Sequence, residues 1–118
     1  MSVLIVDDHE AFRHSARRLL AADGMSVVGE AATGAEALQL AERLKPALVL
    51  VDIQLPDMDG FEVAERLVAS APRAVIVLIS SREAGFYETR LATSVARAFI
   101  SKSDLSVERL RQMMQMPP

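Results

Sequence analysis

Five short apolar runs alternate with longer segments of helical periodicity, and this alternation constrains the fold more than any other feature of the chain. The runs are rich in β-branched residues and lie at 3–6, 27–28, 47–51, 75–79 and 98–100. The third and fourth runs are apolar on both faces, as expected of strands that helices cover on both sides of a parallel sheet. The pattern therefore predicts a doubly wound α/β fold with five parallel strands, joined by right-handed crossovers, and helices on both faces.

Start and stop signals support helices between the runs. The first helix is expected to end near Gly24, because glycine is a common helix stop. The second opens with Thr33 and Glu36 at the spacing of a capping box. Further helices are predicted at 60–70, 81–94 and 104–115. Pro117 and Pro118 either stop the last helix or begin a linker.

Length and composition bound the number of domains and several classes of function. The 118 residues, of which 51% are hydrophobic, are expected to form a single domain over 1–118 with its own core. The chain has no cysteine, which suits a reducing cytoplasm, and its first apolar run is too short to cross a membrane. Because the net charge is −3 and the basic residues are scattered, we expect no binding of nucleic acid by this domain alone.

Polar side chains follow four of the predicted strands. They are Asp7 and Asp8 after the first run, Asp52 after the third, Ser80 after the fourth and Lys102 after the fifth. Functional sites of open parallel sheets lie beyond the carboxyl ends of the strands. Three carboxylates, a hydroxyl and an ammonium group are therefore predicted to meet at one edge of the sheet.

Clustered carboxylates repel one another, so this edge is expected to bind a cation. Mg²⁺ fits best, since it prefers oxygen ligands and is commonly held by one or two carboxylates together with phosphate oxygens. Asp7 and Asp8 are expected to divide into a direct ligand and a water-mediated one, because adjacent side chains of a strand point in opposite directions. A metal ion and Lys102 on either side of Asp52 suit phosphoryl transfer with Asp52 as the nucleophile. Ser80 would donate a hydrogen bond to the phosphoryl group.

These residues, in this order and spacing, resemble the receiver domain of two-component response regulators over essentially the whole chain. The segment 55–60 (LPDMDG) after Asp52 adds to the likeness. The resemblance implies a flavodoxin-like (βα)5 fold with strand order 2-1-3-4-5 and phosphorylation by a partner histidine kinase. It also implies that Asp8, Asp52 and the backbone carbonyl of Gln54 hold Mg²⁺, that Asp7 acts through water, and that Phe99 is the switch aromatic.

The resemblance also suggests where the domain meets its partners. Members of the family often use the fourth helix, fifth strand and fifth helix for homodimers or contacts with an output domain. On this chain the exposed candidates are Tyr87, Arg90, Arg97 and the last helix. Residues 102–105 resemble receivers attached to helix-turn-helix DNA-binding domains, which would imply a role in transcription regulation.

Two other functions compete with that of a signalling switch. One is a magnesium-dependent phosphohydrolase that forms an aspartyl-phosphate, although the chain offers no candidate general acid and no lid insertion. The other is a degenerate interaction domain that is never phosphorylated, against which the intact acidic set argues. We therefore expect a phosphoacceptor signalling domain rather than an enzyme. His9 is expected to be an exposed residue at the start of the first helix.

Overall fold

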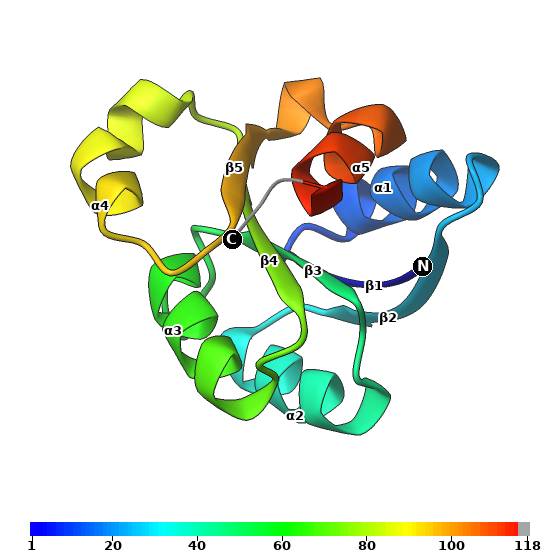
Figure 1. Cartoon of the computed structure of the whole chain (residues 1–118), viewed down its shortest axis with the longest axis horizontal. Coiled ribbons are helices and arrows are strands. Elements are labelled where there is room, and N and C mark those ends of the chain that lie inside the picture. Colours follow the sequence, from blue (N-terminus) through cyan, green and yellow to red (C-terminus); the bar gives the residue numbers. More distant parts are fainter. Residues whose placement is uncertain (116–118) are drawn as a thin grey trace.

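The apolar runs form one parallel sheet in the order β2-β1-β3-β4-β5 (Figure 1). The computed structural model describes residues 1–115. The strands are β1 (Ser2–Val6), β2 (Ser26–Ala31), β3 (Leu48–Asp52), β4 (Val75–Ser80) and β5 (Ala98–Ser101). The helices are α1 (Glu10–Ala22), α2 (Gly34–Leu44), α3 (Gly60–Ser70), α4 (Glu88–Ala92) and α5 (Val107–Gln115), with 3-10 turns η1 (Ala84–Tyr87) and η2 (Lys102–Asp104). The predicted doubly wound fold and its strand order are confirmed.

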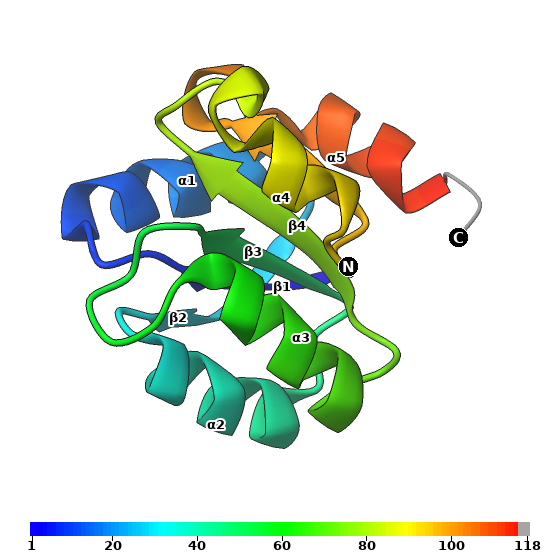
Figure 2. The ribbon, with the colours of Figure 1, turned by 90° about the vertical axis from the view of Figure 1, so that its left-hand side faces the viewer.

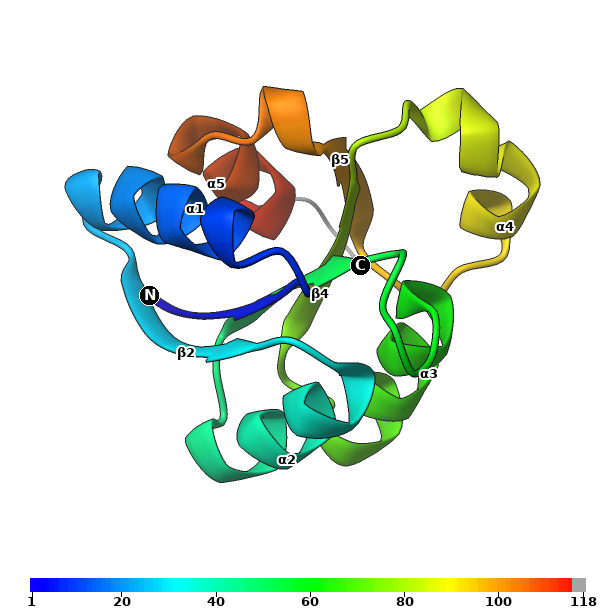
Figure 3. The same ribbon diagram turned by 180° about the vertical axis from the view of Figure 1, so that it is seen from behind.

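Helices cover both faces of this sheet (Figures 1 and 3), and a hydrophobic core lies on each face. Successive side chains of a strand point to opposite faces, so Val3 and Ile5 of β1 pack in the core beneath α1 and α5. Leu4 and Val6 pack in the other core, beneath α2 and α3. All four side chains are completely buried, which explains why the strand sequences are apolar at every position.

The register of the strands brings their carboxyl ends to one edge (Figure 2). Val6 is paired with Val51, the residue before Asp52. Asp52 is in turn paired with Ile79, the residue before Ser80. The loops that follow β1, β3, β4 and β5 therefore start side by side, as the sequence predicted.

The helix starts and stops show how local sequence sets the elements. Gly24 has φ +89°, a conformation that side chains rarely adopt, and it ends α1 as expected. Thr33 caps α2, because its hydroxyl accepts a hydrogen bond from the amide of Glu36 at 3.1 Å. The Glu36 carboxylate completes the cap one residue earlier than a standard capping box, by accepting from the amide of Ala32 at 2.7 Å.

Two predicted helices are shorter than expected, and one strand is longer. The region 81–94 contains only the 3-10 turn η1 and the five-residue α4. The last helix begins at Val107 rather than at 104, because η2 occupies 102–104 and the Ser106 hydroxyl accepts from the amide of Arg109 at 3.1 Å. β2 extends beyond 27–28 because it pairs along β1 from Ser26 to Ala31.

No helix of the part described here is long and apolar enough to span a bilayer. The prediction for Pro117 and Pro118 lies outside the described residues.

Candidate functional site

Two buried carboxylates form the centre of the site. Asp52 is the last residue of β3 and 3% exposed, whereas Asp7 directly follows β1 and is completely buried. The amide of Asp7 donates to the carbonyl of Ala31 at 2.9 Å, which fixes the backbone where the side chain turns inward. Asp8 is exposed. The two adjacent acids thus differ in burial, while their division into a direct and a water-mediated ligand stays a prediction.

Lys102 provides the positive charge beside these acids. Its Nζ lies 2.6 Å from Oδ2 of Asp7 and 3.4 Å from Oδ2 of Asp52. No hydrogen bond of good geometry reaches Oδ2 of Asp7 within residues 1–115, so this oxygen depends on the charge of the ammonium group. The same Nζ lies 4.4 Å from the ring centroid of Phe12, a cation–π distance. Lys102 thus joins α1, β1 and β3.

The electrostatics of Asp52 favour the binding of a cation. Burial raises the pKa of Asp52 above its ordinary value, and the negative charge of Asp7 raises it further. The Lys102 ammonium and the amide of Gln54, which donates to Oδ1 of Asp52 at 3.2 Å, offset part of this rise. A cation beside Asp52 would therefore favour its ionised form, which burial and the charge of Asp7 disfavour.

The donor set fits a hard divalent cation. Asp7, Asp8, His9 and Asp52 each offer one ligand atom, and these atoms lie within 4.8 Å of one another. Most of these atoms are carboxylate oxygens, and Mg²⁺ prefers oxygen ligands. Oδ2 of Asp7 is a second reason for a cation at this place, because it is buried, accepts no hydrogen bond within the described residues and shares the Lys102 ammonium with Asp52.

The loop between β3 and α3 is held close to the acids. The amide of Gly60 donates to the carbonyl of Ile53 at 2.8 Å, and a Cβ on Gly60 would lie 2.5 Å from the carbonyl oxygen of Asp52. Only glycine fits there without displacement of the backbone. This contact explains the glycine that closes the 55–60 segment.

Asp57 ties the same loop to α2. Its carboxylate oxygens accept from the amides of Gly34 at 2.8 Å and Ala35 at 2.9 Å, at the positive end of that helix. The Gly34 amide and then the Ala35 amide hold the pKa of Asp57 below its ordinary value. Asp57 therefore positions the loop from outside the acidic cluster.

Ser80 lies at the edge of the site, but its hydroxyl is hydrogen-bonded to the segment that follows β4. Its hydroxyl is buried, accepts from the amide of Arg82 at 3.1 Å and lies 3.3 Å from the hydroxyl of Tyr87. The prediction that Tyr87 is exposed is wrong, because the side chain is only 7% exposed. Its ring packs against aromatic residues from α3 and β5, Phe61 and Phe99.

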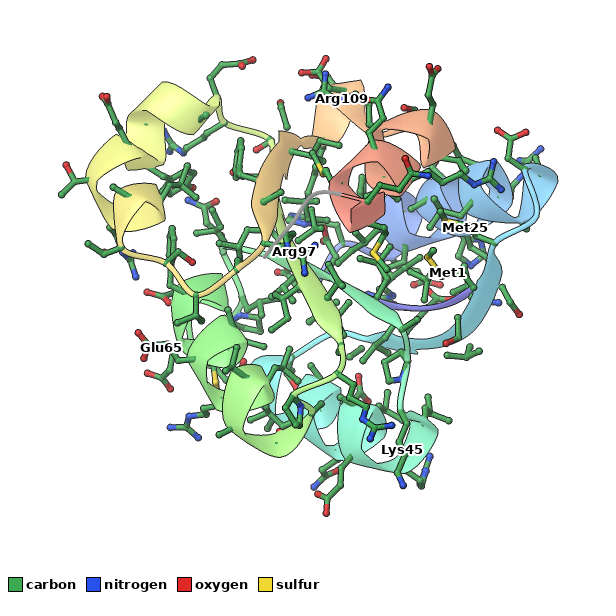
Figure 4. The ribbon with its side chains drawn as sticks, viewed as in Figure 1. Met1, Met25, Lys45, Glu65, Arg97 and Arg109 are labelled. Atoms are coloured by element: carbon green, nitrogen blue, oxygen red, sulfur yellow. The ribbon has the colours of Figure 1, made fainter. Side chains whose placement is uncertain are left out.

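The other predicted surface residues behave differently from Tyr87. Arg90 is exposed, and its Nη2 donates to Oδ2 of Asp59 at 2.6 Å while the guanidinium lies 4.1 Å from the centroid of Phe61. Arg97 is half-buried and directly precedes β5 (Figure 4). Phe99 is also half-buried, 6.2 Å from Tyr87 between ring centroids.

Sequence reasoning missed two residues that contact the acids. His9 is exposed as expected, yet its Nδ1 lies 2.9 Å from Oδ1 of Asp7 and 3.2 Å from Oδ1 of Asp8. Its position directly after the two acids was the available signal. Arg13 donates to the carbonyl of Asp7 at 2.6 Å and to Glu30 at 3.0 Å, and nothing in the sequence indicates this pairing across β2.

Fold and site together define an α/β domain with an acidic, lysine-bridged cluster at the carboxyl edge of its sheet. Comparison with known families agrees, since the profile of the response regulator receiver domain matches residues 3–115. Response regulator GacA of Pseudomonas aeruginosa is 35% identical over 117 residues, which are 96% of this chain and 55% of that protein. The chain belongs to the response regulator receiver domain family, as its motifs predicted.

Solved structures of related proteins have the same fold. A two-component response regulator of the LuxR family from Aurantimonas sp. superposes with a TM-score of 0.84 at 26% identity, over 96% of this chain and 81% of that one. The response regulator domain of Thermotoga maritima CheB gives a TM-score of 0.80 at 28% identity, over 100% of this chain and 98% of that one. The chain spans about half the length of the curated relatives it matches, 49% and 55% in two of them.

Proposed function

We propose that the chain, as one receiver domain over 1–118, accepts a phosphoryl group on Asp52 from a partner histidine kinase in a magnesium-dependent reaction. One observation carries this proposal: Asp52 is buried beside Asp7, with the Lys102 ammonium within 3.4 Å of its carboxylate. A carboxylate whose ionisation is opposed both by burial and by a neighbouring like charge is typical of a functional site, which supports this role.

The chemistry follows from the positions of the side chains. A carboxylate oxygen of Asp52 forms a bond to phosphorus as the bond between phosphorus and the histidine nitrogen breaks, and the imidazole leaves with that electron pair. Lys102 pairs with an oxygen of the transferred group as a point charge. The Ser80 hydroxyl donates to another oxygen.

The acids next to Asp52 hold the metal ion in this proposal. Asp8, Asp52 and the backbone carbonyl of Gln54 would hold Mg²⁺, and Asp7 would act through water. The chemistry that Mg²⁺ would supply there is positive charge for the oxygens of the phosphoryl group. The oxygen donors of the cluster and its excess of negative charge support this assignment.

The output is proposed to pass through the surface of α4, β5 and α5, either to a second copy of the domain or to an output domain. The names of the relatives, which include a DNA-binding transcriptional activator, support transcription regulation as the purpose. A cytoplasmic location is part of the proposal and fits a chain without cysteine.

Acetyl phosphate and Mg²⁺ test the proposal with purified protein. We expect intact mass spectrometry to show a gain of one phosphoryl group that Asp52→Asn and chelation of the metal both abolish. Asp23→Asn, an exposed acid at the end of α1, is the control and keeps the gain. Continuous release of phosphate from many phosphoesters would instead favour a phosphohydrolase. Neither a mass gain nor any response to Mg²⁺ would favour a degenerate interaction domain.

A further inference from the structure

Ser80 and Tyr87 form a buried pair of hydroxyl groups behind the phosphoryl site. Their oxygens lie 3.3 Å apart, and either group can be the donor. Ser80 is the last residue of β4, whereas Tyr87 ends η1 and caps α4. The pair therefore joins the catalytic edge of the sheet directly to α4.

The Tyr87 hydroxyl depends on Ser80 because the rest of its surroundings are apolar. The ring lies among aromatic side chains, with centroid distances of 6.0 Å to Phe61, 4.9 Å to Phe86 and 6.2 Å to Phe99. A buried tyrosine hydroxyl in such an apolar setting requires a hydrogen-bond partner. Within residues 1–115 that partner is Ser80.

Phosphorylation makes a competing demand on Ser80. A serine hydroxyl has one proton, and the amide of Arg82 already donates to its oxygen. Resting on the function proposed above, a phosphoryl group on Asp52 accepts that proton and draws the Ser80 side chain toward β3, which breaks the contact with Tyr87 whichever hydroxyl is the donor. We propose that Tyr87 is a positioning residue, which holds the Ser80 hydroxyl in the unphosphorylated domain and loses it when Asp52 is phosphorylated.

The loss of its partner gives Tyr87 a reason to move. A hydroxyl group left unpaired among Phe61 and Phe99 is unfavourable, so the ring turns to reach another partner or water. Tyr87 is the residue before α4, and Arg90 of that helix anchors it to Asp59 at 2.6 Å. A movement of Tyr87 therefore displaces the start of α4, while Arg90 holds the rest of the helix near α3, and it changes the surface that α4 presents.

The composition of the chain allows this movement to be observed directly. Tyr87 is its only tyrosine, and it has no tryptophan, so intrinsic fluorescence reports on Tyr87 alone. We expect the emission to change with acetyl phosphate and Mg²⁺, in step with the gain of mass, and to stay constant in Asp52→Asn. A full gain of mass with unchanged emission would overturn the inference and leave the proposed function intact.

Removal of the tyrosine hydroxyl tests the competition for Ser80. Tyr87→Phe keeps the ring in its packing and is expected to raise the rate of phosphorylation by acetyl phosphate roughly two- to ten-fold, the effect of one lost net hydrogen bond. Thr89→Val removes an exposed hydroxyl from the same helix and is expected to leave the rate unchanged. A rate for Tyr87→Phe at or below that of the wild type would overturn the inference.

A double-mutant cycle in metal-free, unphosphorylated protein examines the resting contact itself. We expect the double mutant to lose less stability than the sum of the losses in Ser80→Ala and Tyr87→Phe. The reason is that the two substitutions remove the same hydrogen bond. Additive effects would refute the contact. No gain of mass on the wild-type chain would overturn the proposed function and this inference together.

Discussion

Removal of the Lys102 charge tests the electrostatic account of the site. Lys102→Met keeps the length of the side chain but deletes the ammonium group that lies 2.6 Å from the completely buried Asp7. Loss of one partner of a buried ion pair costs about 3 to 5 kcal/mol, and we expect the lower end because Lys102 itself is 15% exposed. For a domain of this size, 1 kcal/mol corresponds to about 4 °C. The metal-free variant is therefore expected to unfold about 12 °C below the wild type.

Mg²⁺ is expected to reduce this difference in unfolding temperature between Lys102→Met and the wild type. In the wild type a cation competes with Lys102 for the Asp7 carboxylate, whereas in Lys102→Met it replaces the missing charge. A ligand at 100 times its Kd adds about 2.7 kcal/mol to stability, so tight binding by the variant offsets most of the loss. Thermal unfolding followed by circular dichroism, with and without Mg²⁺, measures both effects.

Lys45→Met is the matched control for this experiment. Lys45 is the only other lysine of the chain, and its exposed side chain lies at the end of α2 (Figure 4). The control changes the net charge equally but has no buried carboxylate beside it. If Lys102→Met loses no more stability than Lys45→Met, or if Mg²⁺ stabilises both variants equally, the ammonium does not neutralise the buried acids.

Three further substitutions test how the site is positioned. Asp57→Asn removes a carboxylate whose pKa is held below its ordinary value of 3.8 by the first amides of α2. The stability that this carboxylate contributes is present above pH 3.8 and disappears as the pH falls through the lower pKa of the folded state. In acid unfolding the variant should be less stable than wild type near neutral pH and match it in strong acid. Gly60→Ala should lower the free energy of unfolding in urea by about 1 to 3 kcal/mol, whereas Gly85→Ala, where a Cβ meets nothing within 4 Å, should not. Arg13→Gln should weaken Mg²⁺ binding in calorimetry by releasing the backbone of the first acid, whereas Arg17→Gln, which lacks that contact, should not.

The sheet and its acidic edge could be predicted because their signals are local. Runs such as 75–79 are apolar on both faces, which is typical of a strand that is buried on both sides of a sheet. Once the strands are parallel, the residues after each run must meet at one edge. The positions of Asp7, Asp52 and Ser80 follow from this topology without any side-chain detail.

The region around α4 could not be predicted in the same way. A spacing of four between Tyr87 and Leu91 favoured a long helix, yet the structure has only a short one. Contacts distant in sequence decide this segment, namely those of Tyr87 with Ser80 and of Arg90 with Asp59. Periodicity shows which residues share one face of a helix, but it does not show which face another element covers. For this reason Tyr87 was wrongly predicted to be exposed.

The lysine shows a second limit of sequence reasoning and points to the role of the metal. Sequence order placed Lys102 opposite Asp52, but its ammonium lies nearer to Asp7. A phosphoryl group adds roughly 1.5 to 2 negative charges next to Asp52 and draws Lys102 toward itself. Asp7 would then be a buried carboxylate without a counter-charge, which is strongly unfavourable. Under the function proposed above, one lysine does not neutralise both groups, so a divalent cation would supply charge that the phosphorylated state needs as well as aid the transfer.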